Sequence, residues 1–174
     1  MTNKNKLYNV VFPLWMLLVY PPAWLVVLPA NFVVDSLVLL LAAAVLKLDN
    51  KKELYKKSIL RIWLLGFAAD LVGAAVLIGV YALLMLLTAG NTVNGGWLFD
   101  NVAHGFMLDP FSGVLPFLLT LLGVAVAGLC IYQFNRRISF RRLEMEESVK
   151  SKLALTLALC TAPYLFFIPA RLFF

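Results

Sequence analysis

Long apolar runs separated by short basic segments make up most of this chain. The runs are continuous and lack the alternation of polar and apolar residues that is typical of a membrane-spanning β-strand. Most come near the ~20 residues with which a helix crosses a bilayer. The pattern predicts an all-α integral membrane protein that forms a single polytopic domain with five transmembrane helices. The expected spans are residues 9–29, 31–47, 59–88, 112–135 and 152–173.

The composition favours a lipid environment over water. Of the 174 residues, 63% are hydrophobic and 14% are charged, and the mean hydropathy is +0.91. Soluble domains have about 45–50% apolar and about 25% charged residues. We therefore expect the lipid bilayer to be a partner of the chain. The expected location is a multi-pass position in a cell membrane, most simply a bacterial-type plasma membrane.

The basic residues indicate how the spans are oriented. Residues 1–8, 47–61 and 136–152 hold 14 of the 15 Lys and Arg residues, whereas residues 89–111 hold none. Basic loops stay in the cytoplasm. The pattern predicts a cytoplasmic N-terminus, an external loop at 89–111 and an external C-terminus. Because the net charge of +6 comes from segments that flank the apolar runs, it does not indicate a nucleic-acid partner.

Proline residues predict interruptions in the first span. Pro21 and Pro22 together remove two amide donors, so helix 1 is expected to be kinked or broken there. A very tight turn at residues 28–31 is expected to join the first two spans. A broken helix that lines a cavity is the functional interpretation, and a packed kink is the structural one.

The last basic segment is predicted to be a cytosolic helical extension, residues 137–152, that continues into the final span. Two pairs of opposite charge at i,i+4, Arg142–Glu146 and Glu146–Lys150, support a solvated helix there. Pro163 and Pro169 are expected to kink the outer half of the final span.

Two aspartates interrupt otherwise aliphatic runs. An acidic side chain near the bilayer centre costs ~2.5–3.5 kcal/mol, so Asp35 and Asp70 are candidate functional residues. Counted from the basic loop at ~1.5 Å per residue, the two lie at similar depths of about 18 and 14 Å. Asp70 shares a helix face with Gly66 and Gly73, and such small residues allow helices to approach closely. We expect both carboxylates to face one interior site between the first three spans.

No basic residue shares this depth, so the carboxylates need other partners. They could be protonated, because burial and a neighbouring like charge both disfavour the ionised form. They could bind a cation or a cationic solute. They could also form hydrogen bonds with the broken backbone near the tandem prolines or with Asn9, Tyr20, Asn31 or Ser36. A proton, ion or substrate site and a purely structural contact both remain open.

The loop at 89–111 is long and rich in apolar residues. Residues 97–108 are predicted to form a short interfacial helix with Leu98, Val102 and Phe106 on one side. The candidate side chains of the loop are Trp97, Asp100, His104 and Asp109. Asp100 and His104 are spaced i,i+4, but two ligands do not make a metal site, and we assign no metal and no cofactor. The loop is expected either to cover an outward-opening cavity or only to connect two spans.

Three classes of function fit this pattern. The first is a small transport component that binds a proton, cation or small solute at Asp35 and Asp70, assembled as a homo-oligomer or with a partner membrane protein. The second is a non-catalytic membrane subunit or scaffold that packs through its small-residue faces. The third is an intramembrane enzyme with an Asp pair, which ranks last because the neighbours of Asp70 are aliphatic. No catalytic residue is assigned.

Overall fold

The computed structural model describes residues 18, 20–88 and 94–172, apart from the side chains of residues 94, 95, 99, 100, 104 and 171. Every element assigned within this part of the chain is helical, which confirms the predicted all-α class. Elements η3 and η4 are π-helical turns, and the other η elements are 3₁₀ turns. The order is η2 (Pro21–Ala23), α1 (Trp24–Val45), α2 (Lys51–Thr88), α3 (Asn94–Leu98), η3 (Phe99–Ala103), α4 (His104–Leu108), α5 (Val114–Phe134), η4 (Asn135–Ser139), α6 (Glu147–Thr161), η5 (Tyr164–Phe167) and η6 (Ala170–Leu172).

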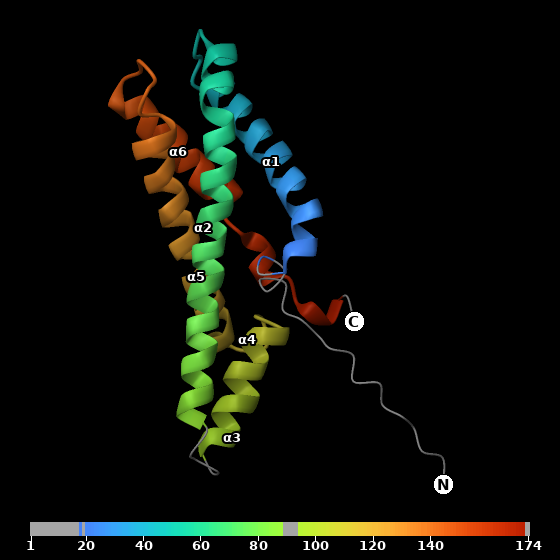
Figure 1. Cartoon of the computed structure of the whole chain (residues 1–174). Helices are drawn as coiled ribbons and strands as arrows, with labels where there is room; N and C mark the ends of the chain where they lie inside the picture. Colours follow the sequence, from blue (N-terminus) through green and yellow to red (C-terminus); the bar gives the residue numbers. More distant parts are fainter. Residues whose placement is uncertain (1–17, 19, 89–93, 173–174) are drawn as a thin grey trace.

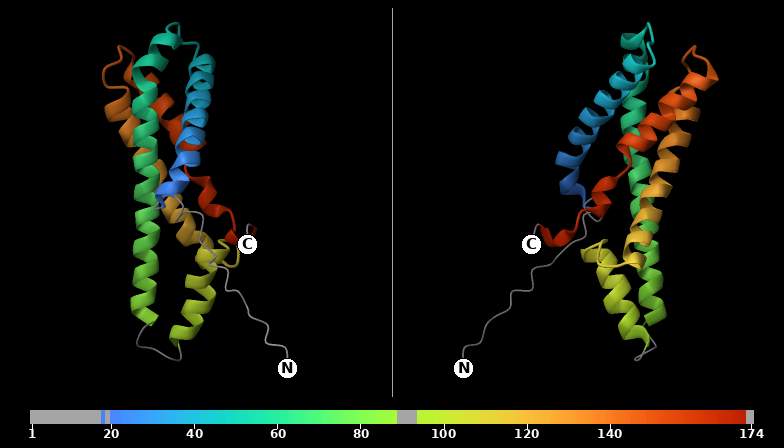
Figure 2. Two further views of the ribbon diagram at one scale, coloured as in Figure 1. Left: turned by 45° about the vertical axis from the view of Figure 1, so that its right-hand side comes forward. Right: turned by 180° about the vertical axis from the view of Figure 1, so that it is seen from behind.

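The central element is α2, whose 38 residues make a rod of about 57 Å. Figures 1 and 2 show α1, α5 and α6 beside the half of α2 that begins at Lys51, and α3 and α4 beside the other half. The most extensive packing joins α2 to α5, followed by the pairs α1–α2, α5–α6 and α1–α6. The arrangement leaves α1, α2, α5 and α6 as a four-helix group at one end of the molecule.

Three segments are long and apolar enough to cross a membrane within the described residues. They are Pro21–Val45, Lys51–Thr88 and Val114–Ser139. These contain most of the expected spans 31–47, 59–88 and 112–135. The structure therefore supports a membrane-associated protein with three candidate transmembrane helices.

The turn predicted at residues 28–31 is wrong. Helix α1 begins at Trp24, directly after the 3₁₀ turn at Pro21–Ala23, and continues without interruption to Val45. Pro29 lies inside it and removes one backbone hydrogen bond near the helix start, which a packed helix tolerates. The indole of Trp63 donates to the Leu28 carbonyl at 2.8 Å and holds this region against α2. The predicted interruption at Pro21-Pro22 agrees with the start of α1, while most of the expected span before it lies outside the described residues.

A tight turn makes α1 and α2 antiparallel. The Leu48 amide donates to the Ala43 carbonyl at 3.0 Å, and the Lys47 amide donates to the Ala44 carbonyl at 3.1 Å. These two hydrogen bonds are typical of a helix end at which the residue after the C-cap adopts a left-handed backbone conformation. Lys47 does so, with φ of 53°. The chain therefore reverses within a few residues and brings the faces of α1 and α2 together.

The final span is not one helix. Helix α6 ends at Thr161, and the chain continues through Pro163, two 3₁₀ turns and Pro169. A proline disfavours the helical conformation of the residue before it, and Ala162 accordingly has ψ of 152°. The expected kinks are therefore complete breaks, and the predicted continuous helix over 152–173 is wrong.

The helical extension predicted for residues 137–152 is not one helix in the structure. After α5 the chain forms the π-helical turn η4 and then a non-helical stretch before α6 begins at Glu147. Glu146 lies at the N-cap of α6, and Lys150 pairs with Glu147 at 2.9 Å. The expected partners Arg142 and Glu146 are not on one helix, because the stretch between η4 and α6 reverses the chain direction.

Apolar side chains form two clusters along α2. One gathers around Leu39, Ile62 and Leu153 near the turns of the bundle, and the other around Leu77 and Phe106. Val102 and Phe106 of the segment 94–108 are buried, so the predicted apolar side of that helix is confirmed at these two positions. The two candidate aspartates lie where one cluster gives way to the other.

Candidate functional site

Asp35 of α1 and Asp70 of α2 lie together in the interior. Asp35 is 4% exposed and Asp70 is 6% exposed, and the two carboxylates are close enough to interact electrostatically. The antiparallel pairing of α1 and α2 brings them to one level. Gly66 lies beside Asp35, and a Cβ at that position would lie 3.5 Å from Asp35 Oδ2, an ordinary contact distance. The structure thus brings together the two aspartates that the sequence singled out.

A small cavity separates the carboxylates. Its volume is about 30 Å³, which is roughly the space of one water molecule or one small cation. Its lining consists of Asn31, Val34, Asp35, Gly66, Asp70 and Thr161. None of these six residues is basic, so the lining offers two acids and no opposite charge.

Hydrogen bonding leaves part of this acid pair unsatisfied. The Asn31 amide donates to Asp70 Oδ2 at 3.4 Å, a long contact. Asp70 Oδ1 is buried and has no hydrogen-bond partner among the described residues. A buried polar atom without a partner costs about 1–3 kcal/mol, and more when it is charged. Among the described residues, no positive or hydrogen-donating group therefore pairs with Asp70 Oδ1.

The end of α6 completes the site. Thr161 faces the Asp35 carboxylate, and its hydroxyl donates to the Leu157 carbonyl at 2.8 Å. The last carbonyls of a helix lack helical donors and carry partial negative charge. The sequence reasoning did not find Thr161, although Pro163, two residues later, was the available signal that a helix ends here.

A larger cavity of about 600 Å³ adjoins the small one. The two share Asn31, Val34, Asp70 and Thr161. The rest of its wall is mostly apolar and comes from the start of α1 and from the broken segment 160–168. Figures 1 and 2 show that this segment passes close to the beginning of α1. Asp70, but not Asp35, thus borders a cavity large enough for a small molecule.

Ser36 does not belong to the site. Its hydroxyl lies 3.0 Å from the Tyr55 hydroxyl and lines neither of the two cavities. Successive residues on a helix point about 100° apart, so a neighbour of Asp35 in the sequence faces another direction. The predicted role of Ser36 as a ligand is therefore replaced by a contact between α1 and α2.

Of the loop candidates, Trp97 and Asp109 lie away from the acid pair. Trp97 is 60% exposed, and buried Asp109 accepts a hydrogen bond from the Phe111 amide at 3.0 Å, which stabilises the turn before α5. The side chains of Asp100 and His104 lie outside the described part of the structure, so their pairing stays a prediction. Neither Trp97 nor Asp109 lines the cavities at Asp70.

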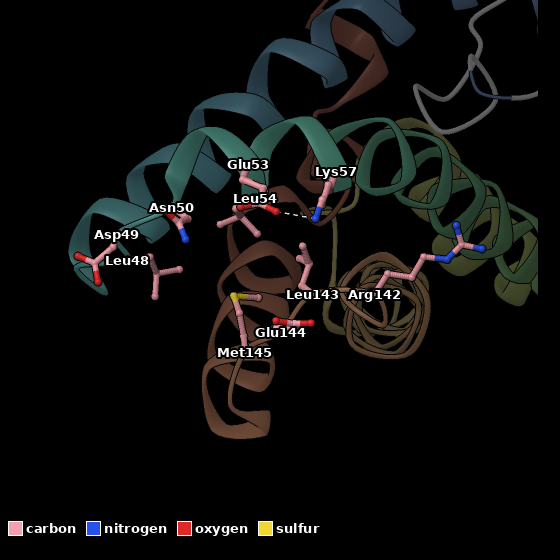
Figure 3. Close-up of a pocket in the computed structure, with 10 residues that line it drawn as sticks. All are labelled: Leu48, Asp49, Asn50, Glu53, Leu54, Lys57, Arg142, Leu143, Glu144 and Met145. Carbon is pink, nitrogen blue, oxygen red and sulfur yellow. Dashed lines mark hydrogen bonds and ion pairs between the residues drawn. The ribbon is translucent and has the colours of Figure 1, made fainter.

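A further cavity of about 490 Å³ lies at the charged end of the bundle, between the α1–α2 turn and residues 142–145 (Figure 3). Glu53 and Lys57, on its edge, pair at 2.5 Å and are more than half exposed. Arg142 points away from this pair (Figure 3). Solvated residues of both signs line this cavity, and it does not concentrate one kind of chemistry as the acid pair does.

No protein-family model, curated protein or solved structure matches this chain. Its function is therefore argued from the geometry of the site alone.

Proposed function

We propose that this protein is a small membrane transport component that binds a proton, a cation or a small cationic solute between Asp35 and Asp70. The observation that carries the proposal is the buried acid pair around a 30 Å³ cavity, with Asp70 Oδ1 unpartnered and no basic residue in the lining. Acidic residues at membrane depth are characteristic of proton and ion pathways.

The electrostatics require a positive charge in this place. Two carboxylates and the C-terminal end of α6 all present negative charge to one small space. Transporters use the same combination, in which interrupted helices and unwound carbonyls coordinate a cation near the bilayer midplane. A proton bound to one carboxyl or a cation between the two relieves the repulsion. An intramembrane enzyme ranks lower, because the adjoining cavity is mostly apolar and offers few groups that could activate a water molecule.

The proposed orientation follows from the basic segments. The α1–α2 turn and the η4–α6 connection lie at the same end of the bundle (Figure 1), and 12 of the 15 basic residues belong to 47–61 and 136–152. We place that end in the cytoplasm and residues 89–111 outside. The predicted cytoplasmic N-terminus and most of the first predicted span lie outside the residues that the structure describes. A homo-oligomer or a partner membrane protein, which would complete a pathway for so small a chain, is part of the same proposal.

Cysteine labelling tests this orientation. A cysteine replacing Asn94 is expected to react with an impermeant thiol reagent on intact cells, and one replacing Ser148 only after the membrane is opened. Variants without Cys130 and Cys160 provide the background for both. Equal labelling at the two positions, or the reverse order, contradicts the proposed orientation.

Asparagine substitution tests the acid pair. Asp→Asn keeps the shape and removes the titratable charge. In purified protein, the thermal stability is measured in series of Li⁺, Na⁺, K⁺ and alkylammonium ions, because a ligand of the native state stabilises it by ~2.7 kcal/mol at 100 times its Kd. Infrared difference spectra report a protonated carboxyl. We expect Asp35→Asn and Asp70→Asn to fold but to lose the response to cations, measured as stabilisation or as the change in the carboxyl band when the cation is added.

The leucine variants separate binding from structure. If the aspartates act only as hydrogen-bonding contacts, both Asn variants keep the wild-type stability and every response, while Asp70→Leu unfolds at a lower temperature. That result would favour the scaffold, for which α2 provides one further observation. Gly79 is exposed, and a Cβ there would meet nothing within 4 Å, so this face is open to a partner helix.

A further inference from the structure

The larger cavity has the form of a site for an organic molecule. Its volume of about 600 Å³ lies in the range of small-molecule pockets, which are mostly apolar with a few polar groups. Val27 and Ala30 of α1 form one wall, and Ala162, Phe166 and Ile168 form the opposite one. The part of a ligand that fits between these walls is therefore a hydrocarbon group.

One end of the cavity is acidic. Asp70 lies there beside Asn31 and Thr161, and its Oδ1 is buried without a hydrogen-bond partner among the described residues. No residue of the lining is Lys, Arg or His. An anion would meet the carboxylate, and an acyl chain of a lipid would leave the buried oxygen without a partner. A ligand that satisfies both ends has an apolar body and a single cationic head with N–H donors.

The broken segment after α6 builds this cavity. Non-helical backbone at membrane depth is tolerated where it is buried in protein or lines a cavity. Residues 162–168 form part of the wall, and the Tyr164 hydroxyl donates to the Leu159 carbonyl at 2.6 Å, which ties the segment back to α6. The interruption of the last helix thus has a use that a continuous helix would not provide.

We propose that this cavity binds an amphiphilic amine, a small hydrophobic molecule whose ammonium group lies against Asp70 and whose hydrocarbon body fills the space between α1 and residues 162–168. The inference rests on the proposed function, because it names the class of solute that uses the same carboxylate. Asp70 lines both cavities. The ammonium group therefore competes for the Asp70 carboxylate with the proton or small cation of the acid pair. Binding of one releases the other.

The test uses full-length protein in nanodiscs of phosphatidylcholine, with empty nanodiscs as the blank for partitioning into lipid. Equilibrium dialysis measures binding of 4-phenylbutylammonium and of 4-phenylbutanol, its uncharged counterpart. We expect wild-type protein to bind the ammonium at least tenfold more tightly than the alcohol. Asp70→Asn is expected to remove that difference. Ala30→Phe fills the cavity without altering the acid pair and is expected to weaken both probes at least tenfold.

Ala44→Phe is the matched control, since Ala44 is an exposed residue of α1 that lines neither cavity. It is expected to bind both probes as wild type does. Equal affinity of wild type for ammonium and alcohol overturns the proposal, as does unchanged binding by Ala30→Phe. The proposal is also overturned if the measured mass shows a dimer of the wild-type chain and a monomer of Ala30→Phe, because a second copy of the chain would then cover the cavity.

The outcomes distinguish this inference from the proposed function. If Asp70→Asn loses the inorganic-cation response while wild type binds no ammonium, the amine site is contradicted and the proposed function stands. If neither the cation response nor ammonium binding changes in Asp70→Asn, the amine site and the proposed function are both contradicted.

Discussion

Helix α2 presents two faces that use glycine in opposite ways. Toward α5, Gly73 lies so close to its neighbours that a Cβ would stand 2.8 Å from the Gly123 carbonyl oxygen and 2.9 Å from the Ala127 Cβ. Toward α1, a Cβ on Gly66 would meet Asp35 Oδ2 at 3.5 Å, an ordinary contact beside a cavity. The first face is closed by backbone contact, and the second is left open around two acids.

The comparison shows that a small residue in a membrane helix has no single meaning. At Gly73 the missing side chain allows close packing, which drives helix association where lipid is as apolar as the protein. At Gly66 it provides volume for a polar group. The predictions below separate the two uses by their effects on stability and on ligand response.

The largest effect on stability is expected on the α5 face. Gly73→Ala places a methyl group against backbone that cannot move without shifting α5, and overpacking of this kind costs about 1–3 kcal/mol. Thermal unfolding in detergent measures it. Gly79→Ala on the same helix is the control, because that position is open and the better helix propensity of alanine favours it by up to ~1 kcal/mol. Equal stability of the two variants would show that α2 and α5 do not meet at Gly73.

A smaller loss is expected at Ser36. Removing its contact with Tyr55 by Ser36→Ala costs about 0.5–1.5 kcal/mol, typical of one hydrogen bond. The response to cations should be unchanged, since Ser36 lines neither cavity. Tyr55→Phe is the matched variant, and the double substitution should cost less than the sum of the two. A loss of cation response in Ser36→Ala would return this residue to the site.

The smallest change in stability is expected at Gly66. The added methyl group of Gly66→Ala makes only an ordinary contact, so the melting temperature should stay close to that of wild type or rise slightly. The 30 Å³ cavity, however, would lose much of its space, and the response to the cation should weaken. A full response from Gly66→Ala would mean that the ligand does not occupy this cavity. Together with Gly73→Ala, it tests whether fold and site can be altered separately on one helix.

The acid pair could be predicted because a charge inside an apolar run has few explanations, and because helix geometry converts sequence spacing into depth. The role of Thr161 could not, since it depends on where α6 ends and what lies opposite. Pro163 signalled an interruption, but the unbroken apolar composition of residues 152–173 favoured a kinked helix over a half-helix. Only neighbouring segments that cover the freed backbone make such a break possible.

The error at residues 28–31 has a related cause. Proline often marks a turn, and the preceding tandem prolines strengthened that interpretation. Contacts of Trp63, thirty-four residues beyond Pro29, hold this region in a helix. Its indole donates to the Leu28 carbonyl, and its ring packs edge-on against Phe32 with the ring centroids 5.6 Å apart. Contacts of this range are set by tertiary packing and leave no local signal.

The length of α2 has a consequence for how the lipid itself acts on the protein. Its apolar part after Arg61 covers Ile62–Thr88, about 40 Å of helix, against a hydrocarbon thickness of ~30 Å. Mismatch costs fractions of a kcal/mol per Å, so about 10 Å of excess corresponds to a few kcal/mol available for tilting α2. Helix α1 and the half-helix α6 are shorter and do not share this excess. If α2 tilted relative to α1 in a bilayer, Asp70 would move against Asp35, and the thickness of the bilayer would then affect the geometry of the acid pair.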